Sequence, residues 1–296
     1  MLSGFVERRI VTSGAEIHAC VGGNGPPLLL LHGFPQCHAM WHRVAPELAR
    51  RFTVVATDLR GYGRSERLPG DPQHANHSKR AMAQDQVEVM RALGHERFFV
   101  AGHDRGARVT HRMALDHSDR VLRAAVIDIV PTVEVFERLD QAMATAYYHW
   151  FFLIQPGGLP EHLIGLDAAF YLRRALGSIG SGGANAGVFD DAALAEYLRA
   201  FRDPAAVHCM CEDYRAAATI DLVHDREDRA AGRKLACPLL ALWGQASVVG
   251  RSYDDVAAIW RAYAPNLTAA ALPGGHFLPE ESPQETVEAL VGFFTG

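Results

Sequence analysis

Short apolar runs alternate with segments of helical periodicity through the first half of the chain. Residues 5–11 and 16–21 read as two strands joined by a turn at Ser13 and Gly14, which predicts a β-hairpin. Further strands are expected at residues 27–31, 53–56, 97–101 and 121–127, and helices at residues 40–50, 79–93 and 107–117. This alternation predicts a mostly parallel sheet with helices on both faces.

The pattern changes in the second half of the chain. Residues 131–225 are mostly helical in pattern and rich in aromatics, and strand patterns return only at residues 239–243 and 267–272. We therefore expect a core domain formed by residues 1–130 and 226–296, interrupted by a helical cap of residues 131–225.

Composition narrows the possible partners. The formal net charge of -5 provides no electrostatic basis for binding nucleic acid or an anionic membrane. No apolar run is long enough to span a bilayer, and the first residues lack the apolar stretch of a signal peptide, so a cytoplasmic location is expected. The cysteines are Cys20, Cys37, Cys209, Cys211 and Cys237. Their spacing fits neither a disulfide framework nor a zinc site, which favours free thiols and no metal.

The strongest chemical signal is the segment Gly102-His103-Asp104-Arg105-Gly106, which lies between a predicted strand and a predicted helix. This is the context of a nucleophile elbow, a sharp turn that needs small flanking residues and exposes its central side chain. A carboxylate at the centre attacks carbon directly and forms an ester that water then cleaves. Asp104 therefore indicates displacement at a saturated carbon, although an aspartate here would also suit a helix cap.

A base and an orienting acid are expected later in the chain, in the order typical of such enzymes. His276 follows the last predicted strand and is flanked by glycines and prolines, which suits a general base for ester hydrolysis. The usual position of the acid, after the strand at residues 239–243, offers no carboxylate before Asp254. We therefore expect Asp128, at the end of an earlier strand, to orient His276, the alternative being a turn residue.

Most of the chain resembles the haloacetate (fluoroacetate) dehalogenases of the α/β-hydrolase superfamily. The matching stretches are residues 32–36, 40–46, 58–63, 102–108, 148–150, 211–215 and 275–279. The specific features are Arg105 and Arg108 after the elbow and the pair His149-Trp150 in the cap. The resemblance implies an α/β-hydrolase fold, a homodimer, and a reaction without a metal or an organic cofactor.

Two guanidinium groups close to Asp104 suit the carboxylate of a substrate, unless they form a solvated basic face. Haloalkane dehalogenases and many epoxide hydrolases have tryptophan where Arg105 stands, so arginine favours an anionic substrate. By resemblance, the leaving halide is held by three cap residues, and Phe34 lines the site. These three are His149, Trp150 and Tyr214. Taken alone, each would be an ordinary core residue of the cap.

One position departs from the family. Better-known members carry a tryptophan near the position of Ile179, which here precedes a glycine-rich segment. Ile179 is expected to line a wider pocket that tolerates acids bulkier than fluoroacetate, such as 2-halopropionates.

The leading hypothesis is hydrolysis of a short 2-halo acid to a 2-hydroxy acid. Epoxide hydrolysis is the alternative enzyme activity, with Tyr147, Tyr148 and Tyr214 as candidate proton donors to the opening ring. A non-catalytic receptor for small acids is a third possibility. Release of halide would indicate the dehalogenase, and formation of a diol would indicate the epoxide hydrolase. Retention of function without Asp104 would indicate the receptor.

Overall fold

A computed structural model describes residues 2–179 and 187–296, except for the side chains of residues 178 and 179. An eight-stranded sheet runs through the centre in the order β1-β2-β4-β3-β5-β6-β7-β8. The strands are β1 (Val6–Val11), β2 (Glu16–Gly22), β3 (Pro27–Leu31), β4 (Thr53–Thr57), β5 (Phe98–His103), β6 (Val121–Ile127), β7 (Leu239–Gly244) and β8 (Leu267–Leu272). β2 pairs antiparallel with both β1 and β4, and all other neighbours are parallel. The predicted fold class is confirmed.

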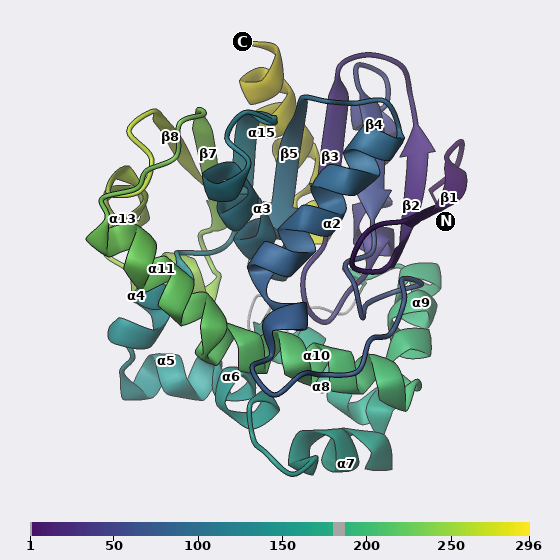
Figure 1. Cartoon of the computed structure of the whole chain (residues 1–296), viewed down its shortest axis with the longest axis vertical. Coiled ribbons are helices and arrows are strands. Elements are labelled where there is room, and N and C mark those ends of the chain that lie inside the picture. The colour runs from purple at the N-terminus through teal and green to yellow at the C-terminus, as the bar shows by residue number, and fades with distance from the viewer. Residues whose placement is uncertain (1, 180–186) are drawn as a thin grey trace.

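The central strands are apolar because helices cover both faces of the sheet. Leu28, Leu29, Leu30 and Leu31 of β3 are fully buried. Figure 1 shows α2 in front of the sheet and α15 behind it. The elements of the core are η1 (His38–Trp41), α1 (Ala45–Leu48), η2 (Ala75–His77), α2 (Lys79–Ala92), α3 (Arg105–Asp116), α12 (Val248–Ser252), α13 (Val256–Arg261), α14 (Leu278–Glu281) and α15 (Pro283–Thr295).

The single helix predicted at residues 40–50 is wrong. The segment forms two short pieces instead, η1 and α1. Pro46 lies in the first turn of α1, where its missing N–H leaves no hydrogen bond unmade. A proline starts a helix more readily than it continues one, which explains the break before it.

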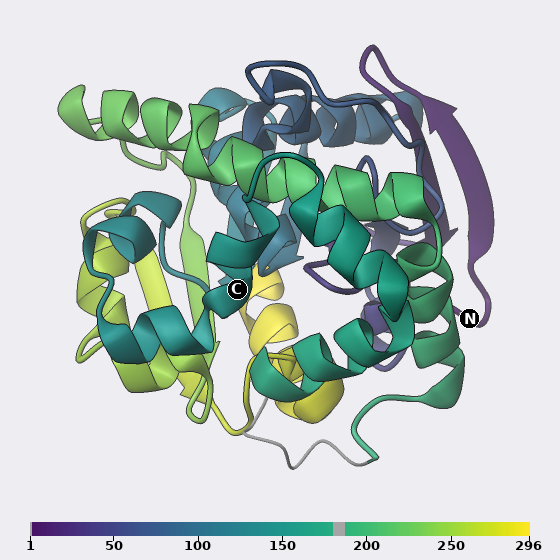
Figure 2. The ribbon, with the colours of Figure 1, turned by 90° about the horizontal axis from the view of Figure 1, so that it is seen from below.

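A layer of helices covers one end of the sheet, at the lower end of the molecule in Figure 1, and Figure 2 views the molecule from that end. These helices are α4 (Thr132–Glu137), α5 (Gln141–Ala146), α6 (Tyr148–Leu153), α7 (Leu159–Leu166), α8 (Ala168–Ile179), α9 (Asp191–Phe201), α10 (Pro204–Ala218) and α11 (Ile220–Ala230). α11 continues past residue 225, where we expected the cap to end. The division into core and cap stays a prediction. Within the described ranges, no helix is both long and apolar enough to cross a membrane.

Candidate active site

Asp104 occupies the sharp turn between β5 and α3. Its backbone has φ 45° and ψ −112°, a left-handed conformation that is strained for a residue with a side chain. A Cβ on Gly102 would lie 2.3 Å from the carbonyl oxygen of Gly106, and one on Gly106 would lie 2.4 Å from that of His32. Both glycines are therefore required for the turn to close.

The carboxylate of Asp104 points away from the helix that follows it. In the described part of the chain it makes no capping hydrogen bond to α3, and Oδ2 instead accepts the backbone N–H of Phe34 at 3.0 Å. Burial opposes ionisation, but the nearby charges of His276 and Arg105 outweigh it and lower the pKa of Asp104. The group is thus held as an anion, as a nucleophile requires.

His276 and Asp128 form a buried pair. His276 Nδ1 lies 2.6 Å from Asp128 Oδ2, and Asp128 Oδ1 accepts the backbone N–H of Gly244 at 2.9 Å. Burial alone would lower the pKa of His276, but its hydrogen bond to Asp128 outweighs burial and raises it. His103 Nε2 also bonds the carbonyl oxygen of His276 at 2.7 Å, which fixes the backbone of this loop. With Nδ1 bonded to Asp128, His276 has Nε2 left for proton transfer.

Arg105 and Arg108 are both buried. They therefore do not form the solvated basic face that was the alternative interpretation. Nε and Nη2 of Arg105 donate to the two carboxylate oxygens of Asp213, both at 2.8 Å. Nη1 of Arg108 donates to Val130 O and to Thr132 Oγ1, both at 3.0 Å. Each guanidinium keeps one buried nitrogen without a partner among the described residues: Nη1 in Arg105 and Nε in Arg108. Buried N–H groups without partners are costly, so these two donors suit an anionic ligand.

The three cap residues expected to hold a halide lie around these arginines. The Tyr214 ring centroid is 4.2 Å from Arg105 Cζ, and that of Trp150 is 4.6 Å from Arg108 Cζ. His149 stacks on Phe34 with ring centroids 5.8 Å apart. Burial lowers the pKa of His149 to about 3, so the imidazole is neutral at physiological pH. His149 Nδ1 and Tyr214 Oη are buried and have no hydrogen-bond partner in the described ranges.

Sequence reasoning missed the groups that hold Arg105. Asp213 on α10 is fully buried and also accepts the hydroxyl of Tyr62 at 2.7 Å and contacts Lys79 Nζ. Asp213 lies next to Tyr214 in one of the stretches that resemble the family, which was the available signal. Tyr62 lies in another of these stretches, residues 58–63, whereas no local pattern pointed to Lys79.

The fold thus brings Phe34 and the predicted catalytic, carboxylate-binding and halide-binding residues together. Ile179 ends α8, and its side chain lies outside the described residues.

Comparison with known proteins places this geometry in a family. The α/β hydrolase fold family matches residues 26–283. A fluoroacetate dehalogenase from Burkholderia sp. is 49% identical over 100% of this chain and 95% of its own length. A soluble epoxide hydrolase from Corynebacterium sp. (strain C12) is 34% identical over 99% of both chains. A solved structure from Nostoc sp. PCC 7120, described as an α/β hydrolase, superposes with a TM-score of 0.96 at 55% identity and covers 100% of this chain and 99% of that one.

The predicted resemblance is therefore confirmed over the full length of the chain. The chain belongs to the haloacetate dehalogenase family of the α/β-hydrolase superfamily.

Proposed function

We propose that the protein hydrolyses the carbon–halogen bond of short 2-halo carboxylic acids, of the fluoroacetate type, to give a 2-hydroxy acid and halide. The observation that carries the proposal is the buried Asp104 carboxylate beside two buried arginines, each of which keeps a donor nitrogen with no partner among the described residues. The 49% identical relative named as a fluoroacetate dehalogenase supports the same substrate class.

The substrate carboxylate binds Nη1 of Arg105 and Nε of Arg108. The other hydrogen bonds of these side chains, to Asp213 and to Val130 and Thr132, hold the donors in place before the substrate arrives. Little reorganisation is then needed on binding, which favours both affinity and orientation of the adjacent carbon.

Asp104 attacks the halogen-bearing carbon from the side opposite the halogen. The carboxylate oxygen forms a bond to carbon, the carbon–halogen bond breaks, and its electron pair leaves with the halide. A leaving fluoride loses its hydration in a dry site and needs hydrogen-bond donors in place of water. His149, Trp150 and Tyr214 provide a ring N–H, an indole N–H and a hydroxyl. His149 Nδ1 and Tyr214 Oη, which have no partner in the described part of the chain, support this role.

Water then cleaves the Asp104 ester. Nε2 of His276 takes a proton from the water, which attacks the carboxyl carbon of Asp104, and the 2-hydroxy acid leaves with a proton returned by His276. Asp128 holds the imidazole in the required tautomer and stabilises its protonated form. The Phe34 N–H, already bonded to Asp104 Oδ2, stabilises the negative charge that develops on that carboxyl group. The mechanism has no step that requires a metal or an organic cofactor.

A panel of short 2-halo acids and simple epoxides tests the proposal, with halide measured by ion-selective electrodes and diols by chromatography. Halide release from 2-halo acids, lost in Asp104→Asn, is the expected result. Epoxide hydrolysis is the second candidate because the buried hydroxyl of Tyr214 could protonate an opening ring and because one relative is an epoxide hydrolase. Diol formation without halide release would favour that activity.

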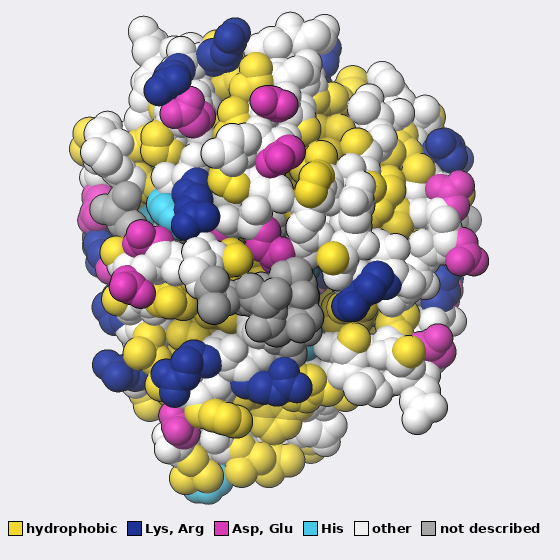
Figure 3. Space-filling model, turned by 180° about the vertical axis from the view of Figure 1, so that it is seen from behind, with side chains coloured by type: hydrophobic (Ala, Val, Ile, Leu, Met, Phe, Trp, Pro, Cys, Tyr) yellow, Lys and Arg dark blue, Asp and Glu magenta, His cyan; other side chains and the backbone are white. Residues whose placement is uncertain are grey.

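The same proposal includes a homodimer in the cytoplasm. The predicted cap exposes several large apolar side chains. They are Leu159, Leu163 and Leu166, which are spaced along one side of α7, and Phe170 of α8. Figure 3 shows hydrophobic side chains gathered at the lower end of the molecule, at the level of the cap helices. An apolar patch of this kind supports contact with a second copy, and light scattering coupled to size-exclusion chromatography measures the assembly.

A further inference from the structure

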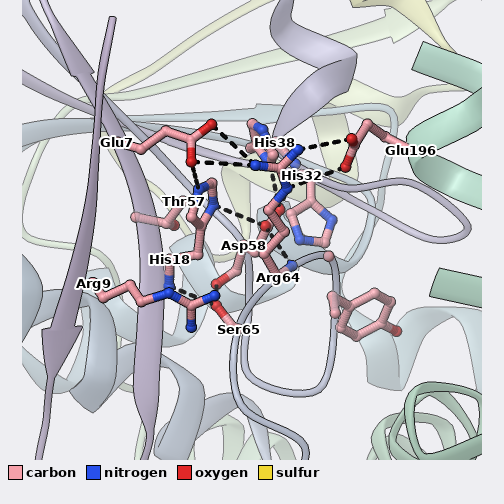
Figure 4. Close-up of polar contacts among 12 residues, drawn as sticks. Glu7, Arg9, His18, His32, His38, Thr57, Asp58, Arg64, Ser65 and Glu196 are labelled. Carbon is pink, nitrogen blue, oxygen red and sulfur yellow. Dashed lines mark hydrogen bonds and ion pairs between the residues drawn. The ribbon is translucent and has the colours of Figure 1, made fainter. Parts of the chain in front are cut away.

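A cluster of metal-ligating side chains lies outside the active site, at the antiparallel edge of the sheet. His18 and Cys20 are two residues apart on β2, so both side chains point to the same face. The turn after β3 brings His38 against them, with the ring centroids of His18 and His38 4.7 Å apart. All three are almost fully buried. Figure 4 shows the two imidazoles on either side of Asp58.

Asp58 orients both rings. Its Oδ2 lies 3.0 Å from His18 Nδ1, and its Oδ1 lies 2.9 Å from His38 Nδ1. Each oxygen also accepts a backbone N–H. Oδ2 accepts that of Arg64 at 2.8 Å, and Oδ1 accepts that of His38 at 2.7 Å. A carboxylate only accepts, so each histidine donates through Nδ1 and keeps Nε2 for another partner. This carboxylate–histidine arrangement is the usual support for imidazoles that bind a metal.

The two histidines lie close to the thiol of Cys20. One ring nitrogen of each histidine and Cys20 Sγ lie within 4.8 Å of one another. His18 Nε2 is buried without a hydrogen-bond partner among the described residues. Its nearest carboxylate is that of Glu7 on β1, with Oε2 at 3.6 Å, and Glu7 is paired in register with Cys20. The Glu7 side chain is 58% exposed, so it lies on the solvent side of the buried ligands.

The cluster also favours positive charge. Asp58, Glu7 and a Cys20 thiolate contribute three negative charges, while Arg64 is already paired with Glu7 and Glu196. A divalent cation would offset this excess of negative charge.

We propose that His18, Cys20 and His38 form a structural site for a zinc-class divalent cation, with the Glu7 carboxylate as the fourth ligand. Two nitrogens, one thiolate and one oxygen match the tetrahedral preference of zinc. Bond lengths of about 2.0 Å to nitrogen and 2.3 Å to sulfur place ligand atoms about 3.5 Å apart, so the side chains close inward on binding. The ion joins β2 to the turn that also carries Phe34, four residues before His38. The sequence alone led us to expect Cys20 to be a free thiol without a metal, and this proposal replaces that expectation.

The test uses the full chain stripped with a chelator and titrated with Co²⁺ alone, a spectroscopic substitute for zinc. We expect one Co²⁺ per chain, with visible bands of tetrahedral cobalt and a near-ultraviolet thiolate-to-metal band. Cys20→Ser should lose the thiolate band and weaken binding at least ~10-fold, whereas the buried but distant Cys237→Ser should match the wild type.

A second measurement needs no variant. X-ray absorption of the zinc-loaded wild type should show one sulfur at about 2.3 Å and two imidazole nitrogens at about 2.0 Å. An all-oxygen shell, binding that stays unsaturated at millimolar metal, or a Cys20→Ser spectrum identical to the wild type would overturn the proposal. Failure of this proposal would leave the proposed function standing, since none of the three ligands is among the residues proposed to act on the substrate.

Discussion

Arg105 and Asp213 form a fully buried ion pair that joins the elbow helix α3 to the cap helix α10. Two parallel hydrogen bonds of 2.8 Å fix the guanidinium in one plane and direct its remaining nitrogen away from the carboxylate. Asp213 thereby sets the position of the guanidinium that we propose binds the substrate carboxylate. The pair also ties α10 directly to the helix that follows Asp104.

Asp213→Asn should damage both stability and substrate binding. The change leaves Arg105 and Lys79 without their shared counter-charge in a buried site, which costs about 3–5 kcal/mol when a buried pair is broken. Urea unfolding measures this loss, and the KM for a 2-halo acid should rise in the protein that remains folded. Asp203→Asn is the matched control on the same helix, because Asp203 is partly exposed and asparagine also caps helices. Equal stability of the two variants would contradict the account.

Arg108→Gln should weaken recognition of the anionic substrate selectively. A hydrogen bond from a charged donor is worth about 1.5–3 kcal/mol, so kcat/KM for chloroacetate should fall roughly 10- to 100-fold. Chloroacetamide, which lacks the negative charge, should lose far less. The ratio of the two specificity constants is the measurement, and a parallel loss for both substrates would show that Arg108 does not bind the carboxylate.

Asp128→Asn should lower the rate and move the pH profile. Asp128 raises the pKa of His276, and the ester is hydrolysed only when His276 is neutral, so activity rises as pH passes through that pKa. Removing the Asp128 carboxylate lowers the pKa of His276. The rising limb of the curve of activity against pH should therefore shift to lower pH. The maximum rate should fall roughly 10²- to 10⁴-fold. An unshifted limb in a folded variant would mean that another group sets the pH dependence.

Ile179→Trp should narrow the range of substrates. By the family resemblance, we expect Ile179 to leave a wider pocket than the tryptophan of better-known members, so the ratio of kcat/KM for 2-bromopropionate over fluoroacetate should fall about 10-fold in the variant. Ile179→Leu, which keeps the volume, is the control. A wild type that already strongly prefers fluoroacetate over every larger acid would count against a widened pocket.

Features encoded by local pattern were predicted well. The parallel strands follow from short apolar runs, and the elbow follows from Gly102 and Gly106 on either side of Asp104, where any Cβ would meet backbone oxygen. Asp128 was found by elimination, because the usual position of the acid, after the strand at residues 239–243, offers no carboxylate before Asp254. The structure places the Asp128 carboxylate 2.6 Å from His276.

Tertiary contacts outside the expected catalytic set were not predicted. Asp213 is 108 residues from Arg105 and 134 from Lys79, and no spacing rule links such positions. The cluster of His18, Cys20 and His38 was missed for the same reason, since the cysteines were judged only by their spacing from one another. The helix at residues 40–50 failed because apolar periodicity was weighed above Pro46.

The most direct test of Asp104 as the nucleophile is a single turnover with enzyme in excess, in heavy-oxygen water. If the ester forms on Asp104, water attacks its carboxyl carbon, and the heavy oxygen appears by mass spectrometry in the peptide that contains Asp104, while the 2-hydroxy acid carries ordinary oxygen. Heavy oxygen in the product of that first turnover, with none in the Asp104 peptide, would show that water attacks the substrate directly and would contradict the mechanism.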